Sequence, residues 1–116
     1  MKQTQDIQDQ LPGALHFDRA SLQHQLDQPG VVLADFWADW CGPCRALAQP
    51  VDELARRSAG RAVVGKLDLD AAPYLAEQLA IHSIPTLVLF QDGEPVDRVV
   101  GLMSAEVIAA KLETWL

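Results

Sequence analysis

The chain has 116 residues, 49% of them hydrophobic, which is enough to expect one folded domain with its own core. Its formal net charge is −7, so a nucleic-acid backbone is excluded as a partner because like charges repel. The first residues lack the basic and apolar pattern of a signal peptide, and no apolar run reaches the length of a membrane span. Two cysteines are too few for a disulfide framework. We therefore expect a cytoplasmic protein with no membrane partner.

The first segment of the chain is expected to be a tail. Residues 1–13 are rich in Gln and Asp, so we interpret them as a mobile tail before a domain that spans residues 14–116. Residues 14–17 are a candidate edge strand. Asp18 is placed to cap a helix that ends before Pro29-Gly30.

The next two predicted elements surround the two cysteines. The run Val31–Ala38 is almost wholly apolar, which predicts a central strand buried on both faces, with Asp35 as the exception. A helix is expected from about Cys41 to Ser58, because apolar residues recur there at helical spacing and Gly60 can end it. Pro50 inside this helix removes one hydrogen bond and should kink it.

Strands and helices continue to alternate in the second half. The predicted elements are a strand at 62–69, a helix entered near Pro73, strands at 86–91 and 96–100, and a helix capped by Ser104. Asp92-Gly93 is a strong signal for a hairpin turn between the last two strands. Trp115 shares the inner face of the closing helix and is interpreted as core. This order predicts an α/β fold with a central mixed β-sheet flanked by helices on both faces.

Both cysteines, Cys41 and Cys44, lie at the junction between the predicted central strand and its helix. A thiolate there is stabilised by the unpaired backbone N–H groups and the dipole of the helix N-terminus. Residues three positions apart share one helical face, so the two sulfurs can close a small disulfide ring with little rearrangement. Zinc is the alternative, but it needs four ligands and the histidines are scattered. The spacing favours redox chemistry.

Asp35 is a carboxyl group in a strand that should be buried on both faces. Burial without a partner raises the pKa of such a group. A carboxyl of this kind suits proton transfer, and we hypothesise that Asp35 takes and returns the proton of Cys44. The alternative is a structural aspartate that is hydrogen-bonded or paired with Lys66.

The segment Asp35–Cys44 reads Asp-Phe-Trp-Ala-Asp-Trp-Cys-Gly-Pro-Cys, and it resembles the active-site segment of the thioredoxin family. The same resemblance extends over nearly the whole domain and is carried further by Ile84-Pro85-Thr86, Gly93, Gly101 and Lys66. It implies the thioredoxin fold and disulfide reductase activity. The chain departs from the family pattern at two places. Pro50 lies one position later than the usual helix proline, and His82-Ser83 precede Ile84 where the family commonly has other residues. These departures bear on partner preference.

The resemblance implies roles for the residues of this segment. Cys41, at an exposed helix start, would be the nucleophile that attacks a client disulfide, and Cys44 would resolve the mixed disulfide. Lys66 is placed near the buried aspartate. Gly42 leaves the backbone open to an incoming chain, and Pro43 supplies no donor to the thiolate, which favours a reductant over an oxidant.

A client-binding surface is also expected around the first cysteine. Trp40, Ile84 and Gly101 should form a flat, partly apolar surface, with Trp37 packed beneath it. The resemblance implies a cis bond before Pro85, in a loop that offers the backbone groups of Ile84 to an extended client, and an ordinary trans proline is the alternative.

The implied function is that of a monomeric protein-disulfide reductase with no bound cofactor. Its implied partners are a flavin- and NADPH-dependent thioredoxin reductase and disulfide-containing client proteins. The alternatives are a reductant or isomerase dedicated to one client, and a non-catalytic binding module with the same fold.

Overall fold

The structure is a computed structural model that describes residues 13–116. The tail expected over residues 1–13 lies, apart from Gly13, outside the described residues. The strands are β1 (Leu15–Phe17), β2 (Val31–Trp37), β3 (Ala62–Asp68), β4 (Thr86–Gln91) and β5 (Glu94–Val100). The helices are α2 (Arg19–Leu26), α3 (Gly42–Arg57), α4 (Pro73–Gln78) and α5 (Ala105–Trp115), with a short 3-10 helix, η1 (Leu69–Ala71).

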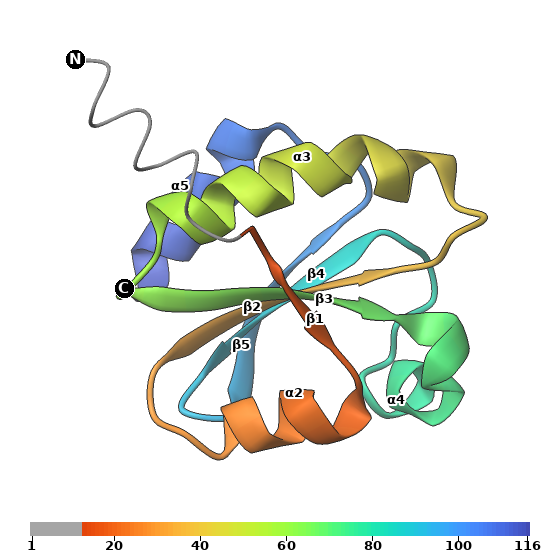
Figure 1. The fold of residues 1–116 in the computed structure, drawn as a ribbon, viewed down its shortest axis with the longest axis horizontal. Helices are drawn as coiled ribbons and strands as arrows, with labels where there is room; N and C mark the ends of the chain where they lie inside the picture. Colours follow the sequence, from red (N-terminus) through yellow and green to blue (C-terminus); the bar gives the residue numbers. More distant parts are fainter. Residues whose placement is uncertain (1–12) are drawn as a thin grey trace.

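A mixed five-stranded sheet runs through the molecule in the order β1-β3-β2-β4-β5 (Figure 1). The strands β1, β3 and β2 are parallel, whereas β4 is antiparallel to β2 and β5 is antiparallel to β4. The register places His16 of β1 beside Lys66 of β3, and Lys66 beside Asp35 of β2. Because paired residues of neighbouring strands point to the same face, these three side chains form one row across the sheet.

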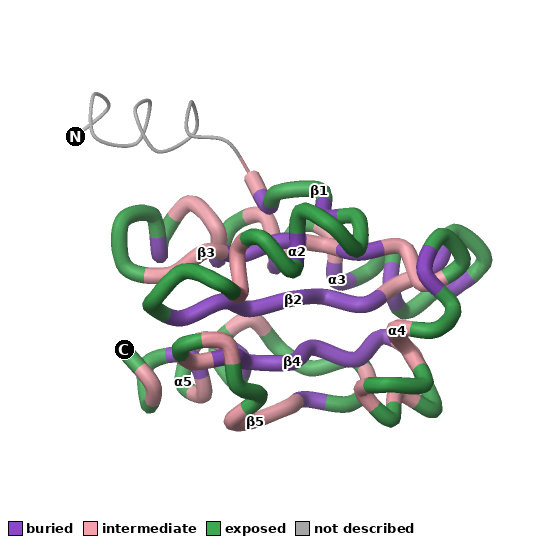
Figure 2. Tube along the Cα trace, turned by 90° about the horizontal axis from the view of Figure 1, so that it is seen from below, coloured by how far each residue is buried: buried purple, intermediate pink, exposed green. Residues whose placement is uncertain are grey.

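Helices cover both faces of the sheet, as the sequence predicts. The helices α3 and α5 lie on one face, and α2 and α4 lie on the other (Figure 1). Figure 2 shows β2 and β4 buried along almost their whole length between these layers. Leu33 packs into the core under α3 and α5. Asp35, two residues further along β2, points to that same face.

Local signals explain where two of the helices begin. Asp18 caps α2, because its carboxylate accepts the Ser21 N–H at 2.7 Å while the Ser21 hydroxyl accepts the Asp18 N–H at 2.9 Å. The Ser104 hydroxyl accepts the Val107 N–H at 3.3 Å at the start of α5. The helix α3 continues on both sides of Pro50, and the kink expected there stays a prediction.

The hairpin at the edge of the sheet is longer than predicted. The strand β5 begins at Glu94, directly after the Asp92-Gly93 turn, and it includes Pro95. A proline is tolerated there because β5 is an edge strand, where one row of N–H groups has no partner. The short helix η1 was not predicted. None of the helices in residues 13–116 has both the length and the apolar character that a membrane span requires.

Candidate active site

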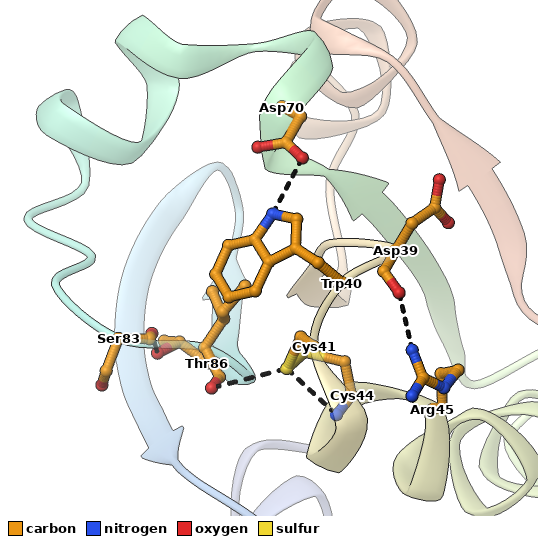
Figure 3. Close-up of a disulfide and its surroundings, with 9 residues drawn as sticks. Asp39, Trp40, Cys41, Cys44, Arg45, Asp70, Ser83 and Thr86 are labelled. Atoms are coloured by element: carbon orange, nitrogen blue, oxygen red, sulfur yellow. Dashed lines mark hydrogen bonds between the residues drawn. A yellow bond between two sulfur atoms is a disulfide. The ribbon is translucent and has the colours of Figure 1, made fainter.

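The two cysteines lie at the start of α3, where β2 has ended and the chain turns through Asp39 and Trp40. Cys41 is the N-cap residue of α3, and its sulfur accepts the backbone N–H of Cys44 at 3.2 Å (Figure 3). The two residues are joined by a disulfide, with their Cα atoms 5.3 Å apart. The pairing expected from the spacing is therefore confirmed.

The expectation that Cys41 is exposed is wrong for this oxidised state. Cys41 is 4% exposed and Cys44 is 3% exposed, so burial does not distinguish them. The Cys41 sulfur lies 3.7 Å from the carbonyl oxygen of Ile84, on the loop that faces the disulfide. Gly42 and Pro43 remain exposed beside it.

Hydrogen bonds fix the loop before β4, which faces the disulfide. The Ile84–Pro85 peptide bond is cis, as the resemblance implies. The Gly101 N–H donates to the Pro85 carbonyl at 2.8 Å, and the Thr86 hydroxyl donates to the Ser83 carbonyl at 2.6 Å. These contacts bring Ile84, Pro85 and Gly101 together, and client binding at this place stays a prediction.

Trp40 is the most prominent apolar side chain next to the disulfide, and it is 70% exposed. Its indole N–H donates to the carboxylate of Asp70 at 3.0 Å, which fixes the ring beside the cysteines (Figure 3). Trp40 lines a groove of about 280 Å³ whose apolar walls include Ile81 and Ile84. The exposed ring and this groove form a partly apolar surface next to the disulfide.

Asp35 is 1% exposed, and its Oδ1 atom has no hydrogen-bond partner among residues 13–116. Burial raises the pKa of this carboxyl from 3.8 to about 7, with Lys66 acting to lower the pKa and Asp52 acting to raise it. Asp35 and Cys44 line the same cavity, which measures about 130 Å³. The half-buried Trp37 lines this cavity too. With a pKa near neutrality, the carboxyl can hold or release a proton in the cavity that it shares with Cys44.

Lys66 lies beside Asp35 in the register but directs its charge elsewhere. Its ammonium group contacts the Asp52 carboxylate at 3.2 Å and donates to the Ala48 carbonyl at 3.1 Å. Burial acts to raise the pKa of Asp52, but the N–H of Ala14 and the ammonium of Lys66 lower it below its ordinary value. The ion pair of Lys66 is therefore made with Asp52, and the pairing with Asp35 that we considered as an alternative is not the one formed.

Sequence reasoning missed Asp52, Asp70 and His16. Asp52 lies eight positions after Cys44, so it shares the inner face of α3, and that spacing could have identified it. Asp70 follows the end of β3, next to the end of β2, where parallel strands bring their carboxyl ends together. The place of His16 at the cavity depends on the register of β1, which carries no local sequence signal.

The alternative of a zinc site has no ligand set in the part of the chain that the structure describes. There, no three His, Cys, Asp or Glu side chains are grouped so that they could hold a metal ion. Both sulfurs are joined to each other.

Comparisons with known proteins agree with this geometry. The Thioredoxin family model matches residues 14–114. The chain is 49% identical over 89 residues to a thioredoxin of Staphylococcus saprophyticus, a match that covers 77% of this chain and 86% of that protein. A thioredoxin of Staphylococcus aureus is 47% identical over 89 residues. A mutant thioredoxin from Halobacterium salinarum NRC-1 has a similar structure, with a TM-score of 0.82, 39% identity, and coverage of 89% of this chain and 90% of that chain.

The family match spans both cysteines and every strand of the sheet. The chain has the thioredoxin fold, and its Cys-x-x-Cys pair carries out dithiol–disulfide exchange, so the protein is a thiol–disulfide oxidoreductase. It belongs to the thioredoxin family.

Proposed function

We propose that this protein is a general protein-disulfide reductase in which Cys41 is the nucleophile, Cys44 resolves the mixed disulfide, and Asp35 accepts and returns a proton. One observation carries the proposal. Cys41 caps α3, whereas Cys44, one turn inside the helix, lines the same cavity as the buried carboxyl of Asp35. The two sulfurs are thus placed in different surroundings, one suited to a thiolate and the other to a proton transfer.

In the first step, the Cys41 thiolate attacks one sulfur of a client disulfide. The client S–S bond breaks, a Cys41–client S–S bond forms, and the second client sulfur leaves as a thiolate that takes a proton from solvent. The Cys44 N–H and the N-terminus of α3 stabilise the attacking thiolate before this step. The exposed Trp40 and the backbone of Ile84 would hold the client segment next to the sulfur.

In the second step, Cys44 attacks the sulfur of Cys41. The carboxylate of Asp35 takes the Cys44 proton, the Cys41–client bond breaks, and the first client sulfur leaves as a thiolate. The protein is left with the Cys41–Cys44 disulfide, and the client has gained two electrons. In the reverse direction, Asp35 returns the proton to Cys44.

The oxidised protein must regain two electrons to act again. Thioredoxin-family proteins work with a thioredoxin reductase and with disulfide-containing clients. We propose that a flavin- and NADPH-dependent thioredoxin reductase supplies these electrons to a monomer of this chain. A reductant of this kind works in a compartment that keeps thiols reduced, which supports the cytoplasmic location expected from the sequence.

Reduction of insulin by NADPH through a thioredoxin reductase tests the proposal. Wild type should sustain NADPH oxidation and precipitate the insulin chains. Cys41→Ser and Cys44→Ser should each abolish turnover, and only the Cys44→Ser variant should accumulate a mixed disulfide with insulin. Asp35→Asn should retain turnover at a reduced rate.

The same assay separates the alternatives. A protein that accepts electrons from the reductase but leaves insulin intact is dedicated to a particular client. A protein that exchanges electrons with neither, while its cysteines can be oxidised and reduced chemically, is a binding module. Either result overturns the proposal of a general reductase.

A further inference from the structure

The cation beside Asp35 in the sheet register, Lys66, makes its ion pair with another carboxylate. Lys66 is the register partner of Asp35 on the adjacent strand, so the two side chains start from neighbouring positions on one face. The ammonium nevertheless contacts the Asp52 carboxylate at 3.2 Å and the Ala48 carbonyl at 3.1 Å, both on α3. Asp35 is left with an Oδ1 atom that has no hydrogen-bond partner in the part of the chain that the structure describes.

Asp52 is itself fixed by the backbone that enters β1. The Ala14 N–H donates to Asp52 Oδ1 at 2.9 Å. Gly13 passes so close to this carboxylate that a Cβ atom at residue 13 would lie 2.7 Å from the same oxygen. The N-terminal backbone therefore sets the position of Asp52, and Asp52 sets the position of Lys66.

From this chain of contacts we propose that Asp52 is a positioning residue: anchored by Ala14, its carboxylate holds the Lys66 ammonium away from Asp35 and keeps that carboxyl free to exchange a proton with Cys44. The inference rests on the proposed role of Asp35. It adds a residue that touches neither client nor sulfur, and it connects the N-terminal backbone to the protonation of the site.

The other charged groups around Asp35 do not replace this arrangement. On α3, Arg45 lines the cavity, and Arg56 acts on Asp52, whose pKa it lowers. On β1, the exposed His16 lines the same cavity. On β4, the register partner of Asp35 is the apolar Leu87. Lys66 acts to lower the pKa of Asp35 and Asp52 acts to raise it. Loss of the Asp52 charge would remove the raising influence and release the Lys66 ammonium, so both changes would lower the pKa of Asp35.

Titration of the Asp35 carboxyl carbon by NMR in the oxidised protein tests the proposal without any enzymatic reaction. Asp52→Asn keeps an oxygen for the Ala14 N–H but removes the charge that binds Lys66. We expect the pKa of Asp35 to fall by about one unit in this variant, because the freed ammonium can approach the carboxylate. Glu53→Gln, which removes the adjacent and exposed carboxylate of α3, should leave the titration of Asp35 unchanged.

A double variant decides whether Asp52 acts by position or only by its own charge. In a Lys66→Met background, Asp52→Asn should shift the pKa of Asp35 by less than half as much as it does in wild type. An equal shift in both backgrounds overturns the positioning role, and so does an Asp52→Asn variant that titrates like Glu53→Gln. Gly13→Ala, which displaces the carboxylate without removing its charge, should also lower the pKa of Asp35, and an unchanged titration would contradict the anchoring by the N-terminal backbone.

The outcome is independent of whether Asp35 takes part in exchange. If Asp35→Asn leaves insulin reduction unchanged, the proposed proton role of Asp35 fails, while the NMR titrations still show whether Asp52 controls its protonation. If Asp35→Asn slows reduction but Asp52→Asn leaves the titration of Asp35 unchanged, only the present inference fails.

Discussion

The backbone N–H of Cys44 points at the sulfur of Cys41, 3.2 Å away. This contact lies at the N-terminus of α3, where the helix dipole also favours a negative charge. Cys44 is the third residue of the helix, and it is Cys41, not Cys44, that caps the helix start. The two buried cysteines thus differ in their electrostatic surroundings and not in exposure.

This difference predicts unequal alkylation of the reduced protein. Iodoacetamide near neutral pH should modify Cys41 at least ten times faster than Cys44, because the thiolate is the reactive form and only Cys41 is stabilised as one by the helix start. Peptide mass spectrometry after short exposures measures both rates. Similar rates at the two sulfurs would contradict the assignment of Cys41 as nucleophile.

The contact between Trp40 and Asp70 leads to a second prediction. Asp70→Ala frees the indole ring, so part of the binding energy of a client is spent on ordering it again. We expect KM for insulin to rise about two- to five-fold, in line with the loss of a hydrogen bond worth about 0.5–1 kcal/mol. The rate with a small aromatic disulfide should stay the same, because such a substrate does not depend on this surface.

A double-mutant cycle checks that the effect belongs to this hydrogen bond. Trp40→Phe removes the donor and should raise KM to a similar extent, and the two changes together should cost less than their sum. Glu77→Gln, an exposed carboxylate on α4, is the matched control. Fully additive effects of the two variants would mean that Asp70 does not act through Trp40.

The sequence predicts the elements of this fold well because its signals are local. The apolar run of β2, the cap at Asp18 and the Asp92-Gly93 turn each act within a few residues, and each lies where it was expected. The start of β5 at Glu94 was missed because Pro95 argues against a strand unless the strand is known to be an edge.

The site was predicted less completely, for a physical reason. The Cys-x-x-Cys spacing and the buried Asp35 are visible in one segment, and the structure brings them together. The partner of Lys66 is not visible there, because it depends on how α3 and β1 pack over β3. The burial of Cys41 likewise depends on the loop at Ile84, which is distant in sequence.

Asp35 should also determine how the rate of resolution depends on pH. Its carboxyl must be ionised to accept the Cys44 proton, and its pKa is raised to about 7, so the rate of resolution should increase as pH rises through about 7. Asp35→Asn should lack this inflection and react about 100-fold more slowly at pH 8. Stopped-flow fluorescence with a mixed disulfide on Cys41 measures the step. The same inflection in the variant would assign it to another group.

The buried carboxyl finally predicts that Asp35→Asn stabilises the oxidised protein above neutral pH. Burial raises the pKa of Asp35 from 3.8 in an exposed setting to about 7 in the fold. Below pH 3.8 the carboxyl is protonated in both states and has no effect on the pH dependence. Between the two values the unfolded chain loses its proton first, so the free energy of unfolding of wild type decreases as pH rises. Above pH 7 the loss is complete and amounts to roughly 4 kcal/mol.

Asparagine keeps the shape of the side chain and does not titrate, although its amide also needs partners in the core. The free energy of unfolding of Asp35→Asn, relative to that of wild type, should therefore increase by roughly 4 kcal/mol between pH 4 and pH 8.5. The cost of burying the amide is the same at both pH values, so it does not affect this difference. Guanidinium unfolding of the oxidised proteins at the two pH values measures this change. Asp39→Asn, which alters an exposed carboxylate just beyond β2, should show almost none of it. A relative stability of Asp35→Asn that does not change with pH, or that falls as pH rises, would mean that the ionised carboxylate is well stabilised in the fold. Lys66 would then have to leave Asp52 for Asp35.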